Sequence, residues 1–411
     1  MSDQSHSCQV CGCQDLETML DLGYQPLCNE FWPADEPARP QTFYPLTLCR
    51  CSECSLVQID YVISTKDAFG EQYTYLTGTS RSLVDYYTKL AATLTERLGL
   101  QPGDAIVEMG SNDGTFLKAF QDLGMNVLGI EGAPAATAVA AQNGVPTITH
   151  FFGEGMSSQI RDRLPTGAKI RLVLAMNVLA HTDNINEFLQ EVVKLMDQDT
   201  VFISQSHWLI ELIRKFEFDT IYHEHLRYYT LGSLGDLFQR HGLNINHAES
   251  NDFYGGSILA QASLSPGERS PEMLEVLEQE KSVDVTSSLK GMKDEIVANK
   301  TKLLSLLVDL KASGKRVIGI GAPMKASTFL NFYGITSDLI EYLAEVNELK
   351  VGTVVPGVRI PVIHEEKLFQ EQPDYAMLLS WNMASFIIPK YREMGYKGKF
   401  ILPVPELEIV E

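Results

Sequence analysis

All seven cysteines of this 411-residue chain lie within its first 54 residues. Four of them form two Cys-x-x-Cys pairs, Cys8 with Cys11 and Cys51 with Cys54, and 39 residues separate the pairs. Each pair can place two thiolates on one tetrahedral ion, so the two pairs together complete a four-sulfur zinc site. A closed site of this kind leaves no coordination position for chemistry. The sequence therefore predicts a structural zinc in a small N-terminal module.

The other three cysteines leave alternatives open. Cys13 and Cys49 each lie two residues from a paired cysteine and could compete as zinc ligands. Cys28 stands alone and is expected to be a small buried hydrophobic side chain. The alternative to a zinc site is a set of free structural thiols. Disulfides are not expected, because the polar N-terminus has no apolar signal core and predicts a cytoplasmic protein.

The net charge and the hydropathy of the chain limit the kinds of molecule that it is expected to bind. The net charge is −20 at pH 7, which argues against a general nucleic-acid binder, since contacts to phosphates need a basic face. No apolar run reaches the roughly 18 residues that a membrane-spanning helix needs. We therefore expect a small-molecule ligand, no contact with nucleic acid or membrane, and a monomer.

Apolar runs alternate with helical patterns after the cysteine-rich segment. This alternation predicts a parallel, doubly wound α/β sheet, and its strand-like runs lie at 105–110, 126–132, 171–180 and 200–206, with a further run at 257–264. A leucine-rich stretch over 271–313 predicts helix, and strand signals after residue 316 predict a second Rossmann-like α/β unit. We expect a zinc module at 1–66, a nucleotide-binding α/β domain at 67–265, and a C-terminal α/β substrate-binding domain at 266–411.

A glycine-rich turn follows the first strand-like run. Its glycines allow close backbone approach to a ligand, and a helix from about Thr115 offers free N–H groups. The spacing is neither a dinucleotide fingerprint nor a phosphate loop. Glu-x-Gly-Ser-Asn-Asp-Gly instead resembles the first motif of class I S-adenosylmethionine-dependent methyltransferases. The resemblance implies that S-adenosylmethionine contacts Glu108, Gly110, Ser111, Asn112, Asp113 and Gly114.

Two later strand ends extend this prediction. Glu131 lies 21 residues after Gly110, where a carboxylate can accept both ribose hydroxyls of an adenosine group; the alternative is a solvated strand end. Asn177 ends the strand expected within the run at 171–180, which corresponds to the fourth strand of such folds, and His181 follows it, at the sheet edge where ligands bind. Asn177 is expected beside the cofactor. His181 is either a polar cap or a group close to the substrate.

The sequence Tyr222-His223-Glu224-His225 is unusual in placing two histidines and an acid within three residues. A zinc site would need further ligands, and none is signalled nearby. A polar surface turn is a second interpretation. The third is acid–base chemistry, in which a histidine that a carboxylate orients removes a proton from a substrate carbon.

Five motifs occur together in one order: the cysteine pairs, Glu-x-Gly-Ser-Asn-Asp-Gly, Tyr-His-Glu-His, Tyr-Gly-Gly-Ser at 254–257 and Ser-Trp-Asn at 380–382. Over essentially the whole chain, this pattern resembles the nucleotide-sugar C-methyltransferase family of deoxysugar biosynthesis. The resemblance implies a zinc module, a methyltransferase domain and a C-terminal Rossmann-like domain. It also implies methyl transfer to the carbon next to the ketone of a thymidine-diphospho-4-keto-deoxysugar.

The same resemblance implies roles for individual residues. His225 is expected to be the base that forms the enolate, and the expected catalytic group around it is Glu224, Tyr222, His181 and Tyr75. The expected substrate contacts are Tyr73, Thr79, Ser80 and Tyr254, with Lys325 and Ser327 at the diphosphate and Trp381 and Asn382 at the nucleotide base. The register between Tyr73 and Tyr75 stays open. Trp381 could instead belong to the hydrophobic core, and Tyr73 and Tyr75 could instead form an aromatic contact that holds two domains together.

Two positions depart from the family pattern. Tyr254 stands where the family commonly has a histidine before Gly-Gly-Ser, and Tyr86-Tyr87 stands where it commonly has another. Both positions are expected near the substrate. The alternatives are a methyltransferase acting on an oxygen, a nitrogen or another activated carbon of a small metabolite, and a non-catalytic nucleotide-binding module that carries a metal. A module that only binds has no need of the Tyr-His-Glu-His motif.

Overall fold

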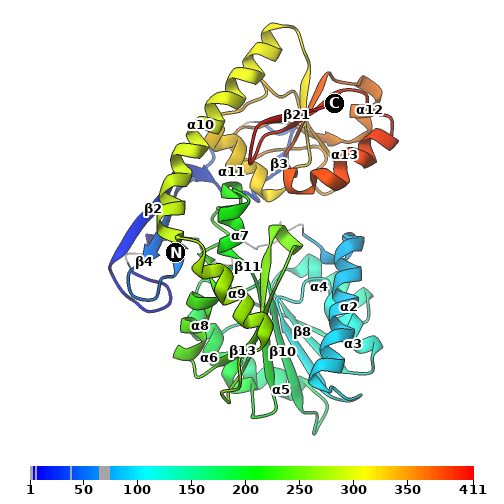
Figure 1. Cartoon of the computed structure of the whole chain (residues 1–411). Coiled ribbons are helices and arrows are strands. Elements are labelled where there is room, and N and C mark those ends of the chain that lie inside the picture. Colours follow the sequence, from blue (N-terminus) through cyan, green and yellow to red (C-terminus); the bar gives the residue numbers. More distant parts are fainter. Residues whose placement is uncertain (1–2, 5–6, 38, 64–74) are drawn as a thin grey trace.

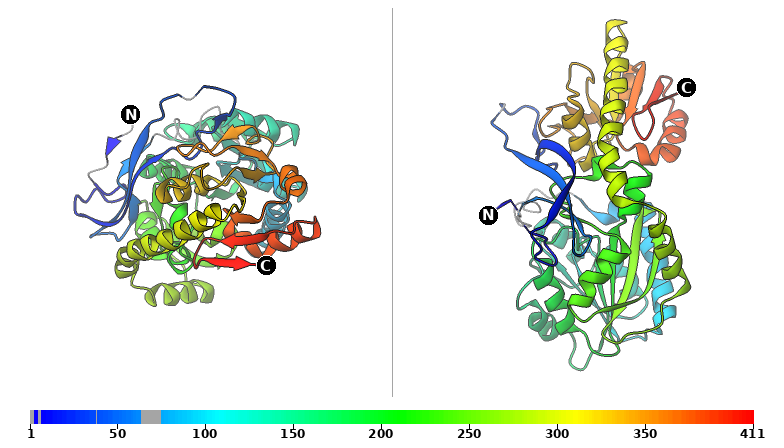
Figure 2. Two further views of the ribbon diagram at one scale, coloured as in Figure 1. Left: turned by 90° about the horizontal axis from the view of Figure 1, so that it is seen from above. Right: turned by 60° about the vertical axis from the view of Figure 1, so that its left-hand side comes forward.

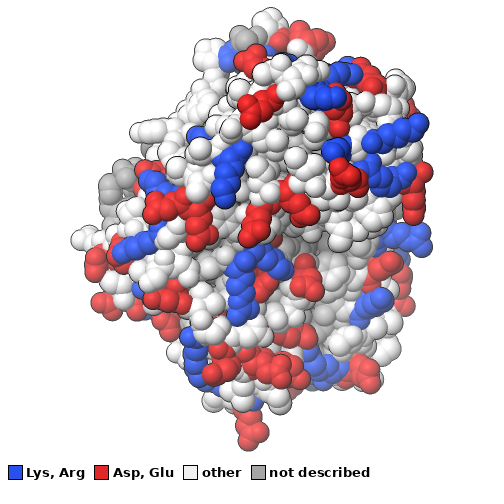
Figure 3. Space-filling view, turned by 45° about the horizontal axis from the view of Figure 1, so that its top comes forward, with Lys and Arg blue, Asp and Glu red and all other residues white. Residues whose placement is uncertain are grey.

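The computed structural model describes residues 3–4, 7–37, 39–63 and 75–411. Three parts follow one another along the chain: N-terminal strands, a central α/β domain and a C-terminal α/β domain (Figure 1). No helix among the described residues is both long and apolar enough to cross a membrane. Acidic and basic side chains are intermixed over the face drawn in Figure 3.

The N-terminal strands join both other domains. A four-stranded antiparallel sheet, in the order β12-β5-β4-β2, contains β2 (Leu16–Pro26), β4 (Phe43–Cys51), β5 (Val57–Ile59) and β12 (Arg227–Tyr228) from the central domain. The short strand β3 (Trp32–Pro33) pairs with β17 (Thr353–Val354) of the C-terminal domain. A two-stranded sheet joins β1 (Asp3–Gln4) to β6 (Tyr61–Val62). The module is therefore built into the rest of the molecule rather than attached to one end.

The central domain is a seven-stranded sheet in the order β13-β14-β11-β10-β7-β8-β9. Its parallel strands are β7 (Ala105–Met109), β8 (Asn126–Glu131), β9 (Thr147–Thr149), β10 (Ile170–Met176) and β11 (Val201–His207). The helices are α2 (Arg81–Leu98), α3 (Thr115–Asp122), α4 (Pro134–Gln142), α5 (Met156–Arg163), α6 (Ile185–Leu195), α7 (Leu209–Arg214), α8 (Leu231–Arg240) and α9 (Pro271–Lys281). Separate hydrophobic cores cover the two faces of the sheet.

One edge of this sheet differs from the parallel arrangement expected from the sequence. Strand β14 (Ser257–Ser263) is antiparallel to both neighbours and lies between β11 and β13 (Asn244–Asn251). The reason is the short connection between β13 and β14, which contains only the one-turn helix η3 (Phe253–Gly255). A connection of that length permits a hairpin but not the crossover that parallel strands need.

The C-terminal domain has a six-stranded sheet in the order β18-β16-β15-β19-β20-β21. Its strands are β15 (Val317–Ile320), β16 (Leu343–Glu345), β18 (Val362–His364), β19 (Tyr375–Leu378), β20 (Lys399–Leu402) and the antiparallel edge strand β21 (Glu408–Val410). The helices are α10 (Val285–Ala312), α11 (Met324–Tyr333), α12 (Glu366–Glu371) and α13 (Ala384–Glu393). The predicted second α/β unit is confirmed.

Helix α10 runs along one side of the molecule, between the N-terminal strands and the C-terminal sheet (Figures 1 and 2). The leucine-rich stretch that predicted helix is split between α9 and α10, and Leu303 and Leu307 of α10 are completely buried. They belong to one core that also contains Leu48 of the N-terminal strands and Leu212 of α7. All three parts of the chain thus share apolar contacts around α10.

Candidate active site and zinc centre

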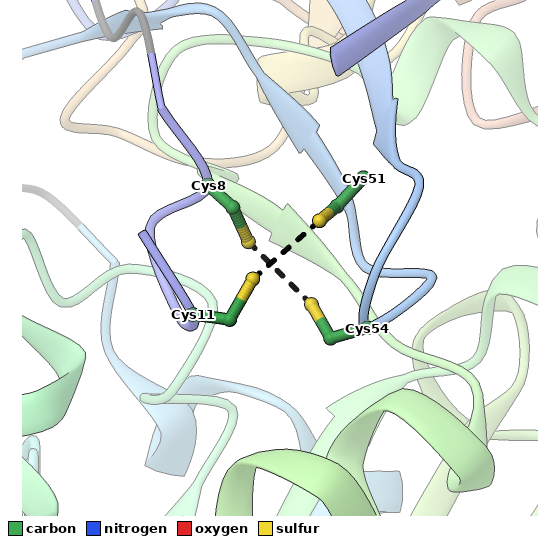
Figure 4. Close-up of side chains that lie close together, drawn as sticks. All are labelled: Cys8, Cys11, Cys51 and Cys54. Atoms are coloured by element: carbon green, nitrogen blue, oxygen red, sulfur yellow. Dashed lines mark hydrogen bonds between the residues drawn. The ribbon is translucent and has the colours of Figure 1, made fainter. Parts of the chain in front are cut away.

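The four paired cysteines converge as their spacing predicts (Figure 4). Their sulfur atoms all lie within 4.8 Å of one another, with Cys8 Sγ 3.5 Å from Cys54 Sγ and Cys11 Sγ 3.5 Å from Cys51 Sγ. Tetrahedral zinc with Zn–S bonds of about 2.3 Å requires sulfur atoms about 3.8 Å apart. The donor set and its spacing therefore fit zinc, and four protein ligands leave no position open for chemistry. The hydrogen bond between Cys8 and Cys54 lowers the pKa of Cys8 and raises the pKa of Cys54, so Cys8 forms its thiolate first of the two.

The remaining cysteines lie outside this cluster. Cys13 Sγ is 3.7 Å from the Ser52 hydroxyl, and Cys49 is buried in β4. Cys28 is buried as expected, but it is more than an apolar filler: its thiol donates to Glu224 Oε1 over 3.1 Å. This contact joins the N-terminal module to the histidine-rich turn of the central domain.

The glycine-rich turn follows β7 and is held by backbone contacts to the next strand. Gly110 has φ +65°, and a Cβ there would lie 2.5 Å from Val178 Cγ2, so only glycine fits. Glu131, at the end of β8, accepts the Asn112 N–H at 2.9 Å through Oε2 and the Ala133 N–H at 2.7 Å through Oε1. The Glu131 carboxylate is therefore fixed by the turn and is not a solvated strand end. Burial raises its pKa.

A second segment lies against the same turn. The one-turn helix η1 (Thr77–Thr79) donates Thr77 N–H to Asn112 Oδ1 at 2.9 Å and Gly78 N–H to Asp113 Oδ2 at 2.6 Å. Asn112 Nδ2 donates to the Tyr75 carbonyl at 3.0 Å. The turn that was expected to hold the cofactor therefore also positions the segment that was expected to reach the substrate. Tyr73, the other candidate in that segment, lies outside the described residues.

Two buried polar atoms beneath the turn, which lack partners among the described residues, show whether the turn fits S-adenosylmethionine. Glu108 Oε2 and Ser111 Oγ are buried, and neither has a hydrogen-bond partner within the described ranges. Burial, followed by the charges of Asp113 and Glu131, raises the pKa of Glu108 well above its ordinary value. Buried polar atoms without partners are costly unless a ligand satisfies them. Their position at the carboxyl edge of the sheet suits the charged amino-acid part of the cofactor.

Two histidines and a tyrosine meet beside this turn. His181, which follows β10, and His225 have ring centres 4.9 Å apart, and the Tyr222 ring stacks on His225 with centres 4.1 Å apart. The Tyr222 hydroxyl is 3.1 Å from His225 Nε2, while His225 Nδ1 is 2.8 Å from the Thr220 carbonyl oxygen. A carbonyl only accepts, so Nδ1 carries the proton and Nε2 of the neutral ring is an acceptor. Burial, followed by the neighbouring histidines, lowers the pKa of His225 well below its ordinary value, and the ring is neutral.

The carboxylate of Glu224 does not orient His225, contrary to the role expected of an acid in this motif. Its Oε1 accepts hydrogen bonds from Cys28 and from Asn29 Nδ2, both in the N-terminal module. Burial raises the Glu224 pKa to about 7. Only the backbone of Glu224 serves the histidines, because its carbonyl oxygen lies 2.6 Å from His181 Nδ1. Adjacent side chains in so tight a turn point in different directions, and the side chain of Glu224 points toward the N-terminal module.

His223 has a structural role. Its Nε2 lies 3.0 Å from the Pro45 carbonyl oxygen in β4, and its side chain is buried against Tyr44. Burial lowers its pKa to about 4. His223 therefore connects the turn to the N-terminal strands, while His225 faces His181.

The tyrosines expected to depart from the family pattern, Tyr254 and Tyr86-Tyr87, meet one another. The Tyr254 hydroxyl lies 3.4 Å from the hydroxyls of both Tyr75 and Tyr87, and the Tyr86 hydroxyl donates to Gln205 Oε1 at 2.7 Å. Tyr254 has φ +56°, in the left-handed region that non-glycine residues rarely occupy. The two departures from the family pattern thus form a single tyrosine cluster above β11.

The C-terminal candidates lie where α11 and η4 (Trp381–Met383) reach the central domain. Trp381 Nε1 donates to Asp219 Oδ2 at 2.7 Å, and Lys325 Nζ lies 3.7 Å from the same oxygen and 4.1 Å from the centre of the Trp381 ring. Lys325 also donates to Asn382 Oδ1 at 3.1 Å, and Ser327 is buried. Trp381 and Lys325 thus meet Asp219 of the one-turn helix η2 (Phe218–Thr220), which sequence reasoning missed.

Three more predicted residues line the edge of the central sheet. Asn177 has φ +56° and donates its N–H to the Gln205 carbonyl at 2.8 Å, which ties the ends of β10 and β11 together. The Thr79 hydroxyl donates to the Leu76 carbonyl at 2.7 Å, and Ser80 Oγ lies 3.0 Å from Ser82 Oγ. Thr79 and Ser80 therefore shape the turn before α2.

Comparison with known proteins adds to this geometry. Family models match three consecutive parts of the chain: a zinc binding domain at residues 8–69, a methyltransferase domain at 83–248 and a C-methyltransferase C-terminal domain at 252–405. The C-methyltransferase NovU of Streptomyces niveus is 33% identical over 408 residues, which cover 98% of this chain and 96% of that protein.

Solved structures match less than half of the chain, at lower identity. Magnesium protoporphyrin IX methyltransferase from Synechocystis, with bound S-adenosylmethionine, has a TM-score of 0.33 at 16% identity, over 44% of this chain and 79% of that chain. The PH0226 protein from Pyrococcus horikoshii has a TM-score of 0.36 at 14% identity, over 46% of this chain and 94% of that chain. Family membership rests on the near-full-length relative and the family models. The chain belongs to the S-adenosylmethionine-dependent C-methyltransferases that carry an N-terminal zinc-binding domain.

Proposed function

We propose that the methyl acceptor is the carbon next to the ketone of a nucleotide-linked 4-keto-deoxysugar, and that His225 removes the proton from that carbon. The observation that carries the proposal is the stacked Tyr222–His225 pair, with Nε2 of a neutral imidazole as proton acceptor beside the cofactor turn. The sugar nucleotide as substrate is supported by the joint motif pattern over the whole chain. A carbon has no lone pair, so C-methylation needs a base of this kind before the carbon can attack.

The residues divide the reaction between them. His225 Nε2 takes the proton, either directly or through the Tyr222 oxygen, while the Thr220 carbonyl holds the Nδ1 proton and fixes the ring. His181 is fixed in the same manner by the Glu224 carbonyl. The turn at Gly110–Gly114 and Glu131 would hold S-adenosylmethionine, which supplies the electrophilic methyl group. The Tyr75–Tyr254 pair lies over this turn and would limit the access of water.

Incubation with thymidine-diphospho-4-keto-deoxysugars in deuterated water tests the proposal. We expect deuterium to enter the carbon next to the ketone when S-adenosylhomocysteine replaces the methyl donor, and one methyl group to be added at that carbon when S-adenosylmethionine is present. The matched control substrate is the 4-hydroxy sugar nucleotide, which cannot form an enolate. Methylation of an oxygen or nitrogen, or methylation of the control, would refute the proposal.

A further inference from the structure

A histidine–carboxylate pair lies at the same sheet edge and has no role in the chemistry described so far. His207 ends β11, next to β10 whose end carries Asn177, and its Nε2 lies 2.9 Å from Glu217 Oε2. The Glu217 side chain is 0% exposed, and that of His207 is 12% exposed. Carboxylates are almost never buried this completely unless they are paired or serve a site.

The surroundings of Glu217 are shaped around its carboxylate. A Cβ on Gly255 would lie 2.5 Å from both carboxylate oxygens, so the turn after β13 needs glycine there. Lys215 Nζ donates to the Gly255 carbonyl at 2.6 Å and fixes that turn. Glu217 Oε1 is buried and has no hydrogen-bond partner in the part of the chain that the structure describes. The fold thus buries a carboxyl group whose one side-chain hydrogen-bond partner among the described residues is His207.

The same residue reaches His225 through its backbone. The Glu217 carbonyl accepts the Thr220 N–H at 3.0 Å and the Thr220 hydroxyl at 2.7 Å, and the Thr220 carbonyl in turn holds His225 Nδ1. His207 is close enough to His225 for its charge to help depress the pKa of His225. Within the described residues, His207 Nδ1 makes no hydrogen bond. Its second nitrogen is therefore the one available to a ligand.

We infer that His207 is a further catalytic residue, which acts with both ring nitrogens protonated: Nε2–H donates to Glu217, and Nδ1–H donates a hydrogen bond to the substrate ketone oxygen. This role rests on the proposed function. When the C–H bond breaks, its proton goes to His225, its electron pair forms the C=C bond, and the carbonyl electron pair moves onto oxygen beside His207. The His207 proton stays on the ring. The enolate pair then forms the new bond to the methyl carbon as the S–CH₃ bond breaks toward sulfur.

Two substitutions of similar size distinguish this catalytic role of His207 from a structural role in which His207 only pairs with Glu217. In His207→Asn, the side-chain amide replaces Nδ1, so the ligand-facing donor remains and the Glu217 contact is lost. In His207→Gln, the amide replaces Nε2, so the Glu217 contact remains and the donor is lost. Loss of one donor to a developing oxyanion typically lowers the rate about 10²–10³-fold. We expect deuterium exchange to fall by that factor in His207→Gln and by less in His207→Asn, with near-normal affinity for the sugar nucleotide in both.

Glu217→Gln and a matched control complete the experiment. Glu217→Gln keeps the volume under Gly255 but removes the charge, and we expect slower exchange at unchanged thermal stability. His247, on β13, forms a histidine–glutamate pair with Glu249 at 3.7 Å on the same sheet, and His247→Asn should exchange like the wild type. If wild type exchanges and His207→Gln is faster than His207→Asn, or both equal wild type, the His207 assignment is wrong. If wild type itself exchanges no keto sugar, the proposed function fails and this role fails with it.

Discussion

The cysteines of the N-terminal module and the histidines of the central domain are both clusters of metal-ligand residue types, yet their surroundings differ. The four cysteine sulfurs point at one another within 4.8 Å. The histidines each give a ring nitrogen to a different protein oxygen: His225 to Thr220, His181 to Glu224 and His207 to Glu217. Ligands that face one common point hold an ion, whereas rings that are each fixed by a different protein oxygen are suited to moving or donating protons. The following predictions test that distinction, from the largest effect to the smallest.

Replacing a zinc ligand should have the largest effect. In Cys51→Ser we expect loss of the zinc and unfolding of the N-terminal strands, because binding of structural zinc contributes roughly 10–16 kcal/mol in small zinc-binding peptides. Metal analysis and thermal denaturation measure the change. Cys13→Ser is the matched control, since Cys13 lies outside the cluster, and it should keep one zinc per chain. Two zinc ions per wild-type chain would show that the histidines also hold a metal.

Replacing the proposed base should abolish chemistry while leaving the metal in place. We expect His225→Asn to lower kcat by about two to four decades, which is the usual contribution of a positioned general base. Zinc content and cofactor affinity should stay normal. His223→Asn is the control and should retain exchange at the sugar carbon. If His181→Asn loses exchange while His225→Asn keeps it, the base is His181.

A substitution in the cofactor turn should change only the affinity for the cofactor. Glu131→Ala removes the expected ribose acceptor and also frees the Asn112 and Ala133 amides. We expect the affinity for S-adenosylmethionine and for its demethylated product to fall by about one to three decades alike, because charge-assisted hydrogen bonds contribute about 1.5–3 kcal/mol each. Calorimetry with both ligands measures this. A loss limited to one of the two would contradict the ribose role.

The smallest effect concerns Glu224, whose pKa is raised to about 7 by burial. Between its unfolded pKa and pH 7 the folded protein holds a proton that the unfolded chain releases, so this group lowers stability as pH rises through that window. Glu224→Gln removes the effect. Relative to wild type, the variant should therefore gain about 2–3 kcal/mol of stability between pH 5 and pH 8. Denaturant titrations at both pH values, with the exposed Glu278→Gln as control, measure it; an equal difference at both pH values would contradict the raised pKa.

The sequence predicted those features that depend on short spacing. The cysteine pairs, the turn at Gly110 and the end of β8 at Glu131 each follow from a few neighbouring residues, and the structure places them as expected. The direction of the Glu224 side chain did not follow, because its partner Cys28 lies 196 residues away. His207 and Asp219 were missed for the same reason, since their partners become neighbours only when strands and domains meet. The run at 257–264 was recognised, but the antiparallel direction of β14 was not, since an apolar run does not reveal the direction of its strand.

The pairing of the N-terminal strands with two domains limits how proteins of this family can be recombined. Strand β5 is completed by β12, and β3 by β17, so each of these short sheets is built from two distant stretches of chain. A chimera that exchanges only the C-terminal domain must still match Trp32–Pro33, and one that exchanges only the central domain must still match Val57–Ile59. A chimera made to alter acceptor specificity should therefore exchange the whole chain, with the zinc module included.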